Sequence, residues 1–484
     1  MSDEMKGFEE LELLDLRRCN TVGDIVTAMS KCSFGARMLG EVSNTLAEMV
    51  ERGDIPVIVY DGKPNTPLDG LLKEMVVRGW AEEVLSPWAY SNGLGSGKNV
   101  LVVGRFPEGD EDALFNRPER AIFVNQFDLA KPGQVKDGFF PDVVFSDPRY
   151  VIPIIFASLE DRLTGSRTTV TQLMNRLPNH GGLANQVAEG ADTVLAMVED
   201  PDATVFLTLS GAMTIAKMGL VLCDMVDEGM VDLISSTGAL MAHGLVESVG
   251  LKHYKHDPRH DDVRLAELKL NRITDTLEPE TNLNQVARVI SEVLEQVDGS
   301  TPISPSIFNR LIGEYLARRF PRERGILKSA YERKVPVLVP AFTDSEVGND
   351  VYTHNVNRGR QGRPRILMDM ELDSRLLMDI MLAAKNPRIF TVGGGVPRNN
   401  TQNVAPLIEI TSERCGLDLP TRMFASGTRI APDSPHFGHL SGCTYNENMS
   451  WRKMDPRGRF TEVRGDATII LPFIVKYIME KRAA

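Results

Sequence analysis

Short apolar runs rich in β-branched residues alternate with longer amphipathic segments along most of the chain. The short runs predict strands at 55–61, 204–210, 231–236, 335–340 and 388–395; the amphipathic segments predict helices at about 213–228, at 372–384 and from about 469. Strands that alternate with helices form parallel sheets with helical crossovers. The pattern therefore predicts an α/β fold, namely a Rossmann-like doubly wound parallel sheet with helices on both faces.

Part of this pattern occurs twice. Residues 21–51 align without gaps on residues 169–199, and residues 71–89 resemble residues 221–239. Chance likeness between amphipathic helices is the alternative, but two matched segments in the same order favour a decayed duplication. We therefore expect a degenerate, partial α/β repeat over residues 1–160 and the principal domain over residues 161–484.

Composition narrows the classes of partner. The chain has 484 residues and a formal net charge of -12, which disfavours nucleic acid or an anionic membrane as the main partner and is compatible with cationic ligands such as polyamines. Its five cysteines are scattered and form no Cys-x-x-Cys pair, as is typical of reduced thiols in a cytoplasmic protein. We expect neither a secretory signal nor a membrane helix.

Small residues follow three of the predicted strands. The segments are LSGAM at 209–213, ISSTGAL at 234–240 and VGGGVPRN at 392–399. In open parallel sheets ligands bind beyond the carboxyl ends of the strands, where glycine lets a phosphate approach backbone N–H groups. Three such turns favour a nucleotide site over ordinary packing, although the Gly-x-Gly-x-x-Gly fingerprint is absent.

Three other segments are ambiguous. GLGSGKN at 93–99 departs from a P-loop at two positions, so we expect a flexible turn there. His253, His256 and His260 have a spacing that could bind metal on a helix, but Pro258 breaks that helix and we expect a solvated loop and no metal. The segment 343–355 gathers Asp344, Glu346, Asp350 and His354 after a buried strand, where they could bind an amine and move protons or simply cap a helix.

The segment SGCTYNENMSWRKM at 441–454 leads to the most specific hypothesis about catalysis. A lysine acts as a nucleophile only when it is neutral, and burial beside an aromatic ring or another cation lowers its pKa. Trp451 and Arg452 could have that effect on Lys453, and Glu447 could bind a substrate ammonium. The alternative is an ordinary surface turn.

This segment, together with the residues that follow it, resembles the active-site region of the deoxyhypusine synthase family. The family pattern is Ser-Gly, four residues, Glu, two residues, then Ser-Trp-Gly-Lys, and the match continues without gaps to Asp466 and Ala467. The resemblance covers about two-thirds of the chain. It assigns catalytic roles to Lys453, His354 and Glu447, substrate binding to Trp451, Ser441, Gly442 and Gly438, and NAD binding to Gly211, Ala212, Ser235, Ser236, Thr237, Gly348, Gly394, Asp466 and Ala467.

The resemblance implies a transferase that uses NAD. Hydride leaves spermidine, Lys453 takes up the aminobutyl group as an imine, 1,3-diaminopropane departs, and an acceptor amine receives the group. The acceptor is a lysine of translation initiation factor 5A in deoxyhypusine synthases and putrescine in the related homospermidine synthases; a catalytically dead NAD-binding regulatory paralogue is a third possibility. The family also implies a cytoplasmic homotetramer with active sites at subunit interfaces.

Several positions depart from the family pattern. Arg452 replaces the family's glycine, Leu440 and Met241 replace two amine-binding carboxylates, with His243 near the second, and an insertion at 357–364 follows His354. An unpaired ammonium in a buried site costs several kcal/mol, so the substrate must be held differently or be a different amine. The N-terminal repeat lacks a Ser-Trp-x-Lys motif, so we expect it to have a capping or assembly role.

Overall fold

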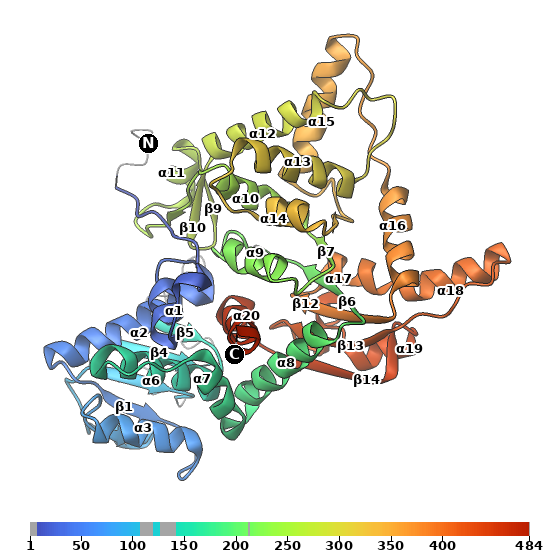
Figure 1. Cartoon of the computed structure of the whole chain (residues 1–484). Helices are drawn as coiled ribbons and strands as arrows, with labels where there is room; N and C mark the ends of the chain where they lie inside the picture. The colour runs from blue at the N-terminus through green and yellow to red at the C-terminus, as the bar shows by residue number, and fades with distance from the viewer. Residues whose placement is uncertain (1–6, 107–119, 126–141, 212, 484) are drawn as a thin grey trace.

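The computed structural model describes residues 7–106, 120–125, 142–211 and 213–483 (Figure 1). The charged segment PEGDEDALFNRPER at 107–120, whose composition is typical of a loop or linker, lies outside these ranges except for Arg120. Within them, no helix combines the length and the apolar character that crossing a bilayer requires.

The C-terminal part is built on a six-stranded sheet in the order β11-β7-β6-β12-β13-β14, in which every pair is parallel. The strands are β6 (Ala203–Leu209), β7 (Leu233–Ser236), β11 (Val337–Leu338), β12 (Asn386–Val392), β13 (Phe424–Ile430) and β14 (Met454–Val463). All four strands predicted in this part of the chain are present. The pattern did not predict β13 and β14.

Helices cover both faces of this sheet, so the doubly wound α/β prediction is confirmed. Along β6 the side chain of Phe206 enters one apolar cluster and that of Leu207 enters the other, as the alternation of a buried strand requires. The helices α8 (Gly182–Glu199), α9 (Gly219–Asp227) and α20 (Ala467–Ala483) cover one face; α16 (Met370–Ala383), α17 (Gly395–Gln402), α18 (Val404–Cys415) and α19 (Tyr445–Ser450) cover the other (Figure 1).

The helix predicted from residue 213 begins only at Gly219. Lys217 has a φ of 70°, a left-handed conformation that ends any right-handed helix, and its side chain is buried. The apolar periodicity of residues 213–218 therefore reflects burial in an irregular turn.

The N-terminal part contains a second parallel sheet, in the order β2-β1-β3-β4-β5. Its strands are β1 (Val57–Tyr60), β2 (Val84–Leu85), β3 (Val100–Val103), β4 (Ala121–Asn125) and β5 (Val143–Phe145). Taken in chain order, these strands correspond to β6, β7, β12, β13 and β14, and the two sheets then have the same spatial order. The strand order therefore supports the duplication inferred from the sequence, and the correspondence extends over all five strands of the first sheet.

The second copy has longer connections than the first in three places, most of all between β7 and β12. There it carries β11 and a helical arm with a small antiparallel sheet, whereas the first copy connects β2 to β3 by α4 (Pro87–Ser91) and the glycine-rich turn at 93–99. The arm contains α10 (Gly238–Ser248), β8 (Tyr254–Lys255), α11 (Asp262–Glu267), β9 (Leu270–Ile273), β10 (Thr276–Pro279), α12 (Glu280–Leu294), α13 (Pro305–Arg319), α14 (Ile326–Arg333) and α15 (Glu346–Arg360). The connections between β12 and β13 and between β13 and β14 are also longer, and the second of them carries the 441–453 segment.

A layer of helices joins the two copies. The first copy contributes α1 (Val22–Met29), α2 (Phe34–Arg52) and α6 (Pro148–Thr164), and the second contributes α7 (Val170–Arg176), α8 and α20. Thr21 and Thr169, which the alignment equates, each close a capping box at the start of α1 and α7. Side chains of both sheets and of this layer form one apolar core. The domain boundary near residue 160 stays a prediction; that residue lies inside α6.

Each copy caps a helix of the other. Asp147 precedes α6 and accepts a hydrogen bond from the Leu183 amide at the start of α8, at 3.2 Å. Asp466 precedes α20 and accepts one from the amide of Gly35, the residue that the alignment equates with Leu183. The two copies are therefore related by matching, crosswise contacts.

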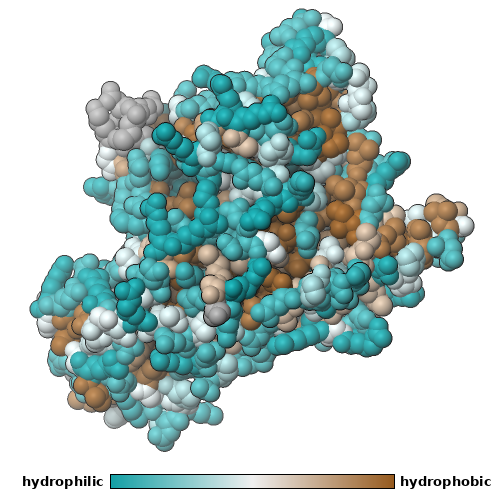
Figure 2. Space-filling view, in the orientation of Figure 1, coloured by the Kyte–Doolittle hydropathy of each residue, from teal (hydrophilic) through white to brown (hydrophobic). Residues whose placement is uncertain are grey.

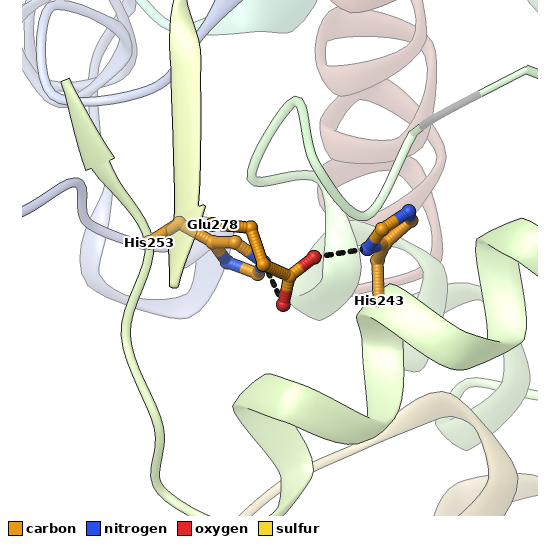
Figure 3. Close-up of side chains that lie close together, drawn as sticks. All are labelled: His243, His253 and Glu278. Atoms are coloured by element: carbon orange, nitrogen blue, oxygen red, sulfur yellow. Dashed lines mark hydrogen bonds and ion pairs between the residues drawn. The ribbon is translucent and has the colours of Figure 1, made fainter. Parts of the chain in front are cut away.

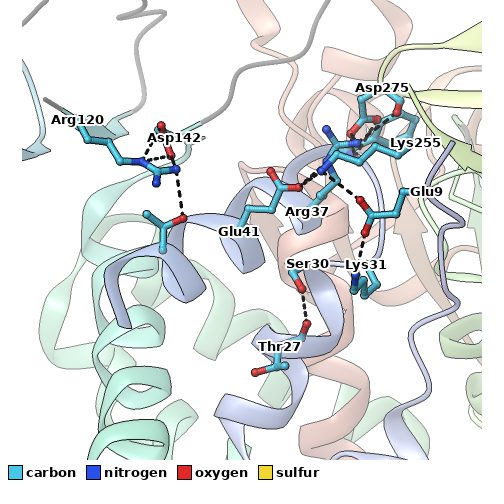
Figure 4. A network of polar contacts seen from close by, with 12 residues as sticks. Glu9, Thr27, Ser30, Lys31, Arg37, Glu41, Arg120, Asp142, Lys255 and Asp275 are labelled. Carbon is cyan, nitrogen blue, oxygen red and sulfur yellow. Dashed lines mark hydrogen bonds and ion pairs between the residues drawn. The ribbon is translucent and has the colours of Figure 1, made fainter. Parts of the chain in front are cut away.

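A buried ion pair reinforces this junction (Figure 4). Arg37 of α2 lies 3.1 Å from Asp275, and both side chains are fully buried. Beside them Lys255 contacts Glu41 at 2.6 Å. The start of α2 thus contacts both α20 and the small antiparallel sheet of the second copy.

We predict that Gly35→Ala destabilises the protein by about 1–3 kcal/mol, because the new methyl group would lie 2.0 Å from a carboxylate oxygen of Asp466. The measurement is thermal unfolding. Gly70→Ala in the exposed face of α3 (Pro67–Val77) is the matched control, since nothing lies near that position and alanine favours a helix. Equal melting temperatures for the two variants would contradict the prediction.

Candidate active site

The residues assigned to cofactor binding gather at the carboxyl edge of the six-stranded sheet. Gly211 follows β6, Ser235 and Ser236 end β7, Thr237 caps α10, Gly348 lies in the first turn of α15, Gly394 precedes α17, and Asp466 and Ala467 follow β14. Ala212 lies outside the described residues. β6 and β12 are neighbours at the centre, where the chain passes to opposite sides, and ligands bind at such switch points.

The turns at this edge have the backbone geometry that a phosphate site needs. Gly211 has a φ of 71° and open space where a side chain would be. The Gly394 amide donates to the Ser210 hydroxyl at 2.7 Å, which ties the first and third glycine turns together. The open space at Gly211 is compatible with close approach of a ligand to the backbone, whereas the Gly348 amide already donates to the Ser345 hydroxyl, at 3.2 Å.

Other assigned side chains already have partners within the protein. The hydroxyl groups of Ser235 and Ser236 donate to the backbone oxygens of Pro397 and Thr237, at 3.3 and 3.2 Å. Asp466 is bound by amides of Gly35 and Thr468, and its burial raises the pKa of its carboxyl group. These side chains shape the edge of the sheet without being free to bind a ligand.

Lys453 immediately precedes β14, and its side chain is held between α17 and α19. The residue is 6% exposed, its ammonium donates to Asn399 Oδ1 at 3.1 Å, and it lies 5.8 Å from the Trp451 ring. Burial lowers the pKa of Lys453, and the charge of Arg398 adds to this, while Cys443 and Glu447 oppose it. The site therefore favours a neutral amine.

The expected roles of Arg452 and Trp451 in that shift were wrong. Arg452 points away from Lys453, is 63% exposed and pairs with Glu409 of α18 at 3.1 Å. Its φ of 55° is a conformation that glycine adopts without strain, which gives a physical reason for a glycine in the family motif. The Trp451 side chain is exposed and contacts the ammonium with its ring, an arrangement that favours the charged form.

The rest of the 438–451 segment surrounds Lys453. Ser441 packs against Gly394, where a side chain would lie 2.6 Å from the Ser441 Cα atom, and Gly442 packs equally closely on Ser434. Gly438 is exposed in a left-handed turn. Glu447 is exposed in the first turn of α19, where its charge reaches Lys453. The structure thus brings Lys453, Glu447, Trp451, Ser441 and Gly394 into one neighbourhood.

His354 lies elsewhere. It is buried on α15, where its Nδ1 atom is 2.9 Å from the Ser291 hydroxyl and its Nε2 atom is 3.6 Å from Glu295, and burial lowers its pKa. Figure 1 shows α15 and α12 in the upper arm and α19 and β14 at the lower right. Within one chain, His354 and Lys453 therefore do not form a common site.

Acidic residues are present near the start of α15, close to His243. Burial and the neighbouring Glu346 raise the pKa of Asp350 to about 6, and the charge of Glu346 also reaches His243. Met241, at the position of a family carboxylate, is buried in the main apolar core. The second missing carboxylate position is occupied by Leu440, which is 47% exposed.

A buried cluster that the sequence did not reveal lies behind this edge (Figure 3). His243 and His253 flank Glu278, and each directs a ring nitrogen toward one of its carboxylate oxygens. On the other side of His253, Lys217 lies 2.9 Å from Nδ1 and 2.6 Å from Glu247. The expectation of a solvated loop was wrong for His253 and His256, because both side chains are buried. The spacing of the histidines in this segment did not indicate the cluster, because the partners of His253 lie outside the segment.

The cluster could be a metal site by composition, since the ligand atoms of its three members lie within 4.8 Å of one another. The Lys217 ammonium, however, donates to Nδ1 of His253, which places the ring proton on Nε2, where it faces Glu278. Glu278 lies against Nδ1 of His243, and Glu247 pairs with Lys217. These contacts hold the ring of His243 in place.

We predict a pH-dependent contribution of His243 to stability. Glu278 and Glu346 raise its pKa above 6.5 despite burial, so its stabilising effect is complete below about pH 6.5 and is lost as the pH rises through the folded-state value. His243→Gln should therefore flatten the fall in melting temperature between about pH 6 and pH 9. The exposed His436→Gln should retain the wild-type slope; parallel curves for all three proteins would refute the prediction.

Comparison with known proteins identifies the family. Residues 172–478 match the family model described as deoxyhypusine synthase. "Probable deoxyhypusine synthase 2" of Methanosarcina mazei is 32% identical over 329 residues, which are 68% of this chain and 90% of that protein. The protein of the same name from Methanosarcina acetivorans is 32% identical over 65% of this chain and 87% of its own length.

A bacterial relative is similar to the same degree. The "Deoxyhypusine synthase-like protein" of Chlorobaculum parvum is 30% identical over 66% of this chain and 88% of its own length. The family model begins within α7 and covers the second copy to near the end of α20. The chain therefore belongs to the deoxyhypusine synthase family and is a transferase.

Proposed function

We propose that the protein transfers the aminobutyl group of spermidine, in an NAD-dependent reaction, through an imine on Lys453 to an acceptor amine. The observation that carries this proposal is the state of Lys453, a buried amine with a lowered pKa beside the glycine turns of the sheet. The acceptor proposed first is a lysine of translation initiation factor 5A.

The residues of the chain account for the steps as follows. Bound NAD would accept hydride from the substrate and return it to the product. The neutral amine of Lys453 attacks the resulting imine carbon, its nitrogen loses a proton, and the carbon–nitrogen bond to 1,3-diaminopropane breaks as that amine is protonated. The acceptor amine then displaces Lys453 in the same way. Asn399, which accepts a hydrogen bond from the amine, orients it for both steps.

One observation favours a small diamine such as putrescine as a second candidate acceptor. Two positions at which the family has amine-binding carboxylates hold Met241, in the apolar core, and Leu440, at the surface. Glu447, Glu346 and Asp350 are the carboxylates left to neutralise a polyamine. This altered set of charges changes how the amine is held and supports a homospermidine synthase-type reaction.

We further propose that a second copy of the chain completes the site, as in a homotetramer. His354 and Lys453 lie apart in one chain, and exposed apolar side chains flank both: Tyr352 and Val356 beside His354, and Phe437, Leu440 and Trp451 near Lys453. Figure 2 shows hydrophobic residues gathered over α15, α16 and α18. The first copy, which packs on α20 and on the small antiparallel sheet, has a structural role in this assembly.

We predict that borohydride traps a butylamine adduct on Lys453 when the protein is incubated with NAD and labelled spermidine. Mass spectrometry of the 441–454 region would locate the label, and Lys453→Ala should abolish it because that change removes the amine proposed to form the imine. Lys385→Ala, which removes an exposed lysine, should leave trapping unchanged. Normal NAD binding without any adduct would favour the regulatory-paralogue alternative.

Mixing two inactive variants would test the shared site. Lys453→Ala and His354→Gln should each lose most activity. When the two variants are co-expressed, about half of the dimers are mixed and each mixed dimer has one intact site, so about a quarter of wild-type activity should return. Recovery should not occur when either variant is mixed with itself. An inactive mixture with proven mixed assembly would show that each chain uses its own residues.

A further inference from the structure

Two buried arginines hold the loop that leads to Lys453. Arg398 of α17 and Arg429 of β13 are 2% and 1% exposed. Their Nη1 atoms both donate to the backbone oxygen of Cys443, at 2.7 and 2.8 Å, and Arg429 also donates to that of Ser441 at 2.7 Å. One carbonyl oxygen thus receives two charge-assisted hydrogen bonds, which is a strong restraint on loop position.

The neighbouring groups complete this clamp. Glu462 of β14 accepts a hydrogen bond from the Tyr445 amide at 2.8 Å and pairs with Arg429 at 3.3 Å. The Arg398 guanidinium lies 5.4 Å from the centre of the Tyr445 ring. Tyr445 begins α19, and α19 ends three residues before Lys453. The clamp therefore fixes the start of the helix that delivers the lysine.

Arg398 is also coupled to Lys453 directly. The next residue, Asn399, accepts the hydrogen bond of the Lys453 ammonium. The charged or titratable groups that face Lys453 are Arg398 from α17, Cys443 from the loop and Glu447 from α19; Arg429 and Glu462 lie behind the loop. Arg398 is the cation in this set that acts on Lys453, and Arg452 points away.

We propose that Arg398 is the positioning residue of the Lys453 site: it fixes the 441–445 loop and supplies the positive charge beside the working amine. The role rests on the proposed function only in taking Lys453 as that amine. A nearby cation disfavours the ammonium form by like-charge repulsion, and the buried setting strengthens the effect.

The test measures the reactivity of Lys453 without cofactor or polyamine. Propanal with cyanoborohydride alkylates neutral amines, and mass spectrometry follows the Lys453 peptide as a function of pH, with exposed Lys385 as the internal standard. The variants are Arg398→Met, which removes the charge, and Arg398→Lys, which keeps it. Arg452→Met is the matched control, because it removes the arginine adjacent to Lys453 in the sequence.

We expect Arg398→Met to move the alkylation midpoint of Lys453 upward by about one pH unit, with Lys385 unchanged. Arg398→Lys should restore most of the wild-type midpoint, and Arg452→Met should coincide with wild type. A loss of packing alone would not be rescued by lysine. If Arg398→Met and wild type have the same alkylation midpoint, the inference is wrong. If the midpoint depends on Arg398 but spermidine is not trapped on Lys453, only the proposed function is contradicted.

Discussion

The junction between the two copies depends on two carboxylates that cap helices. Asp147 and Asp466 stand at the starts of equivalent helices, and each is bound by the first turn of the long helix of the other copy. A carboxylate buried between helices must be hydrogen-bonded. Separating the two copies would leave the first turns of α2 and α8 without these hydrogen-bond acceptors and would expose the apolar core that the copies share. The two sheets are therefore parts of one folding unit.

The residues with candidate chemistry lie on connections that are longer in the second copy than in the first. The connection between β7 and β12 holds His243 and His354, and the one between β13 and β14 holds Glu447 and Lys453. The core strands kept their order in both copies. Rigid strands and helices thus provide fixed starting points, and the connections between them hold Lys453 and His354, whose pKa values are lowered by burial.

Much of the fold could be predicted from local patterns. Buried strands such as β6 and β12 are continuous apolar runs, and the repeated helix has the same caps in both copies, so periodicity and alignment find them. Local patterns could not predict three other features: the turn around Lys217, the His243–Glu278–His253 cluster and the effect of Arg398 on Lys453. Each depends on residues that meet only after folding, and sequence adjacency pointed to Arg452 instead.

The crosswise caps also constrain how this chain can evolve. Gly35 leaves room for one oxygen of Asp466, and Leu183 donates to Asp147 from the equivalent position, so two contacts that are alike in geometry are made by different residue pairs. A larger side chain at position 35 would require a compensating change at Asp466, which is more than four hundred residues away in the sequence. The packing of each copy at this junction therefore constrains which residues the other copy can hold there.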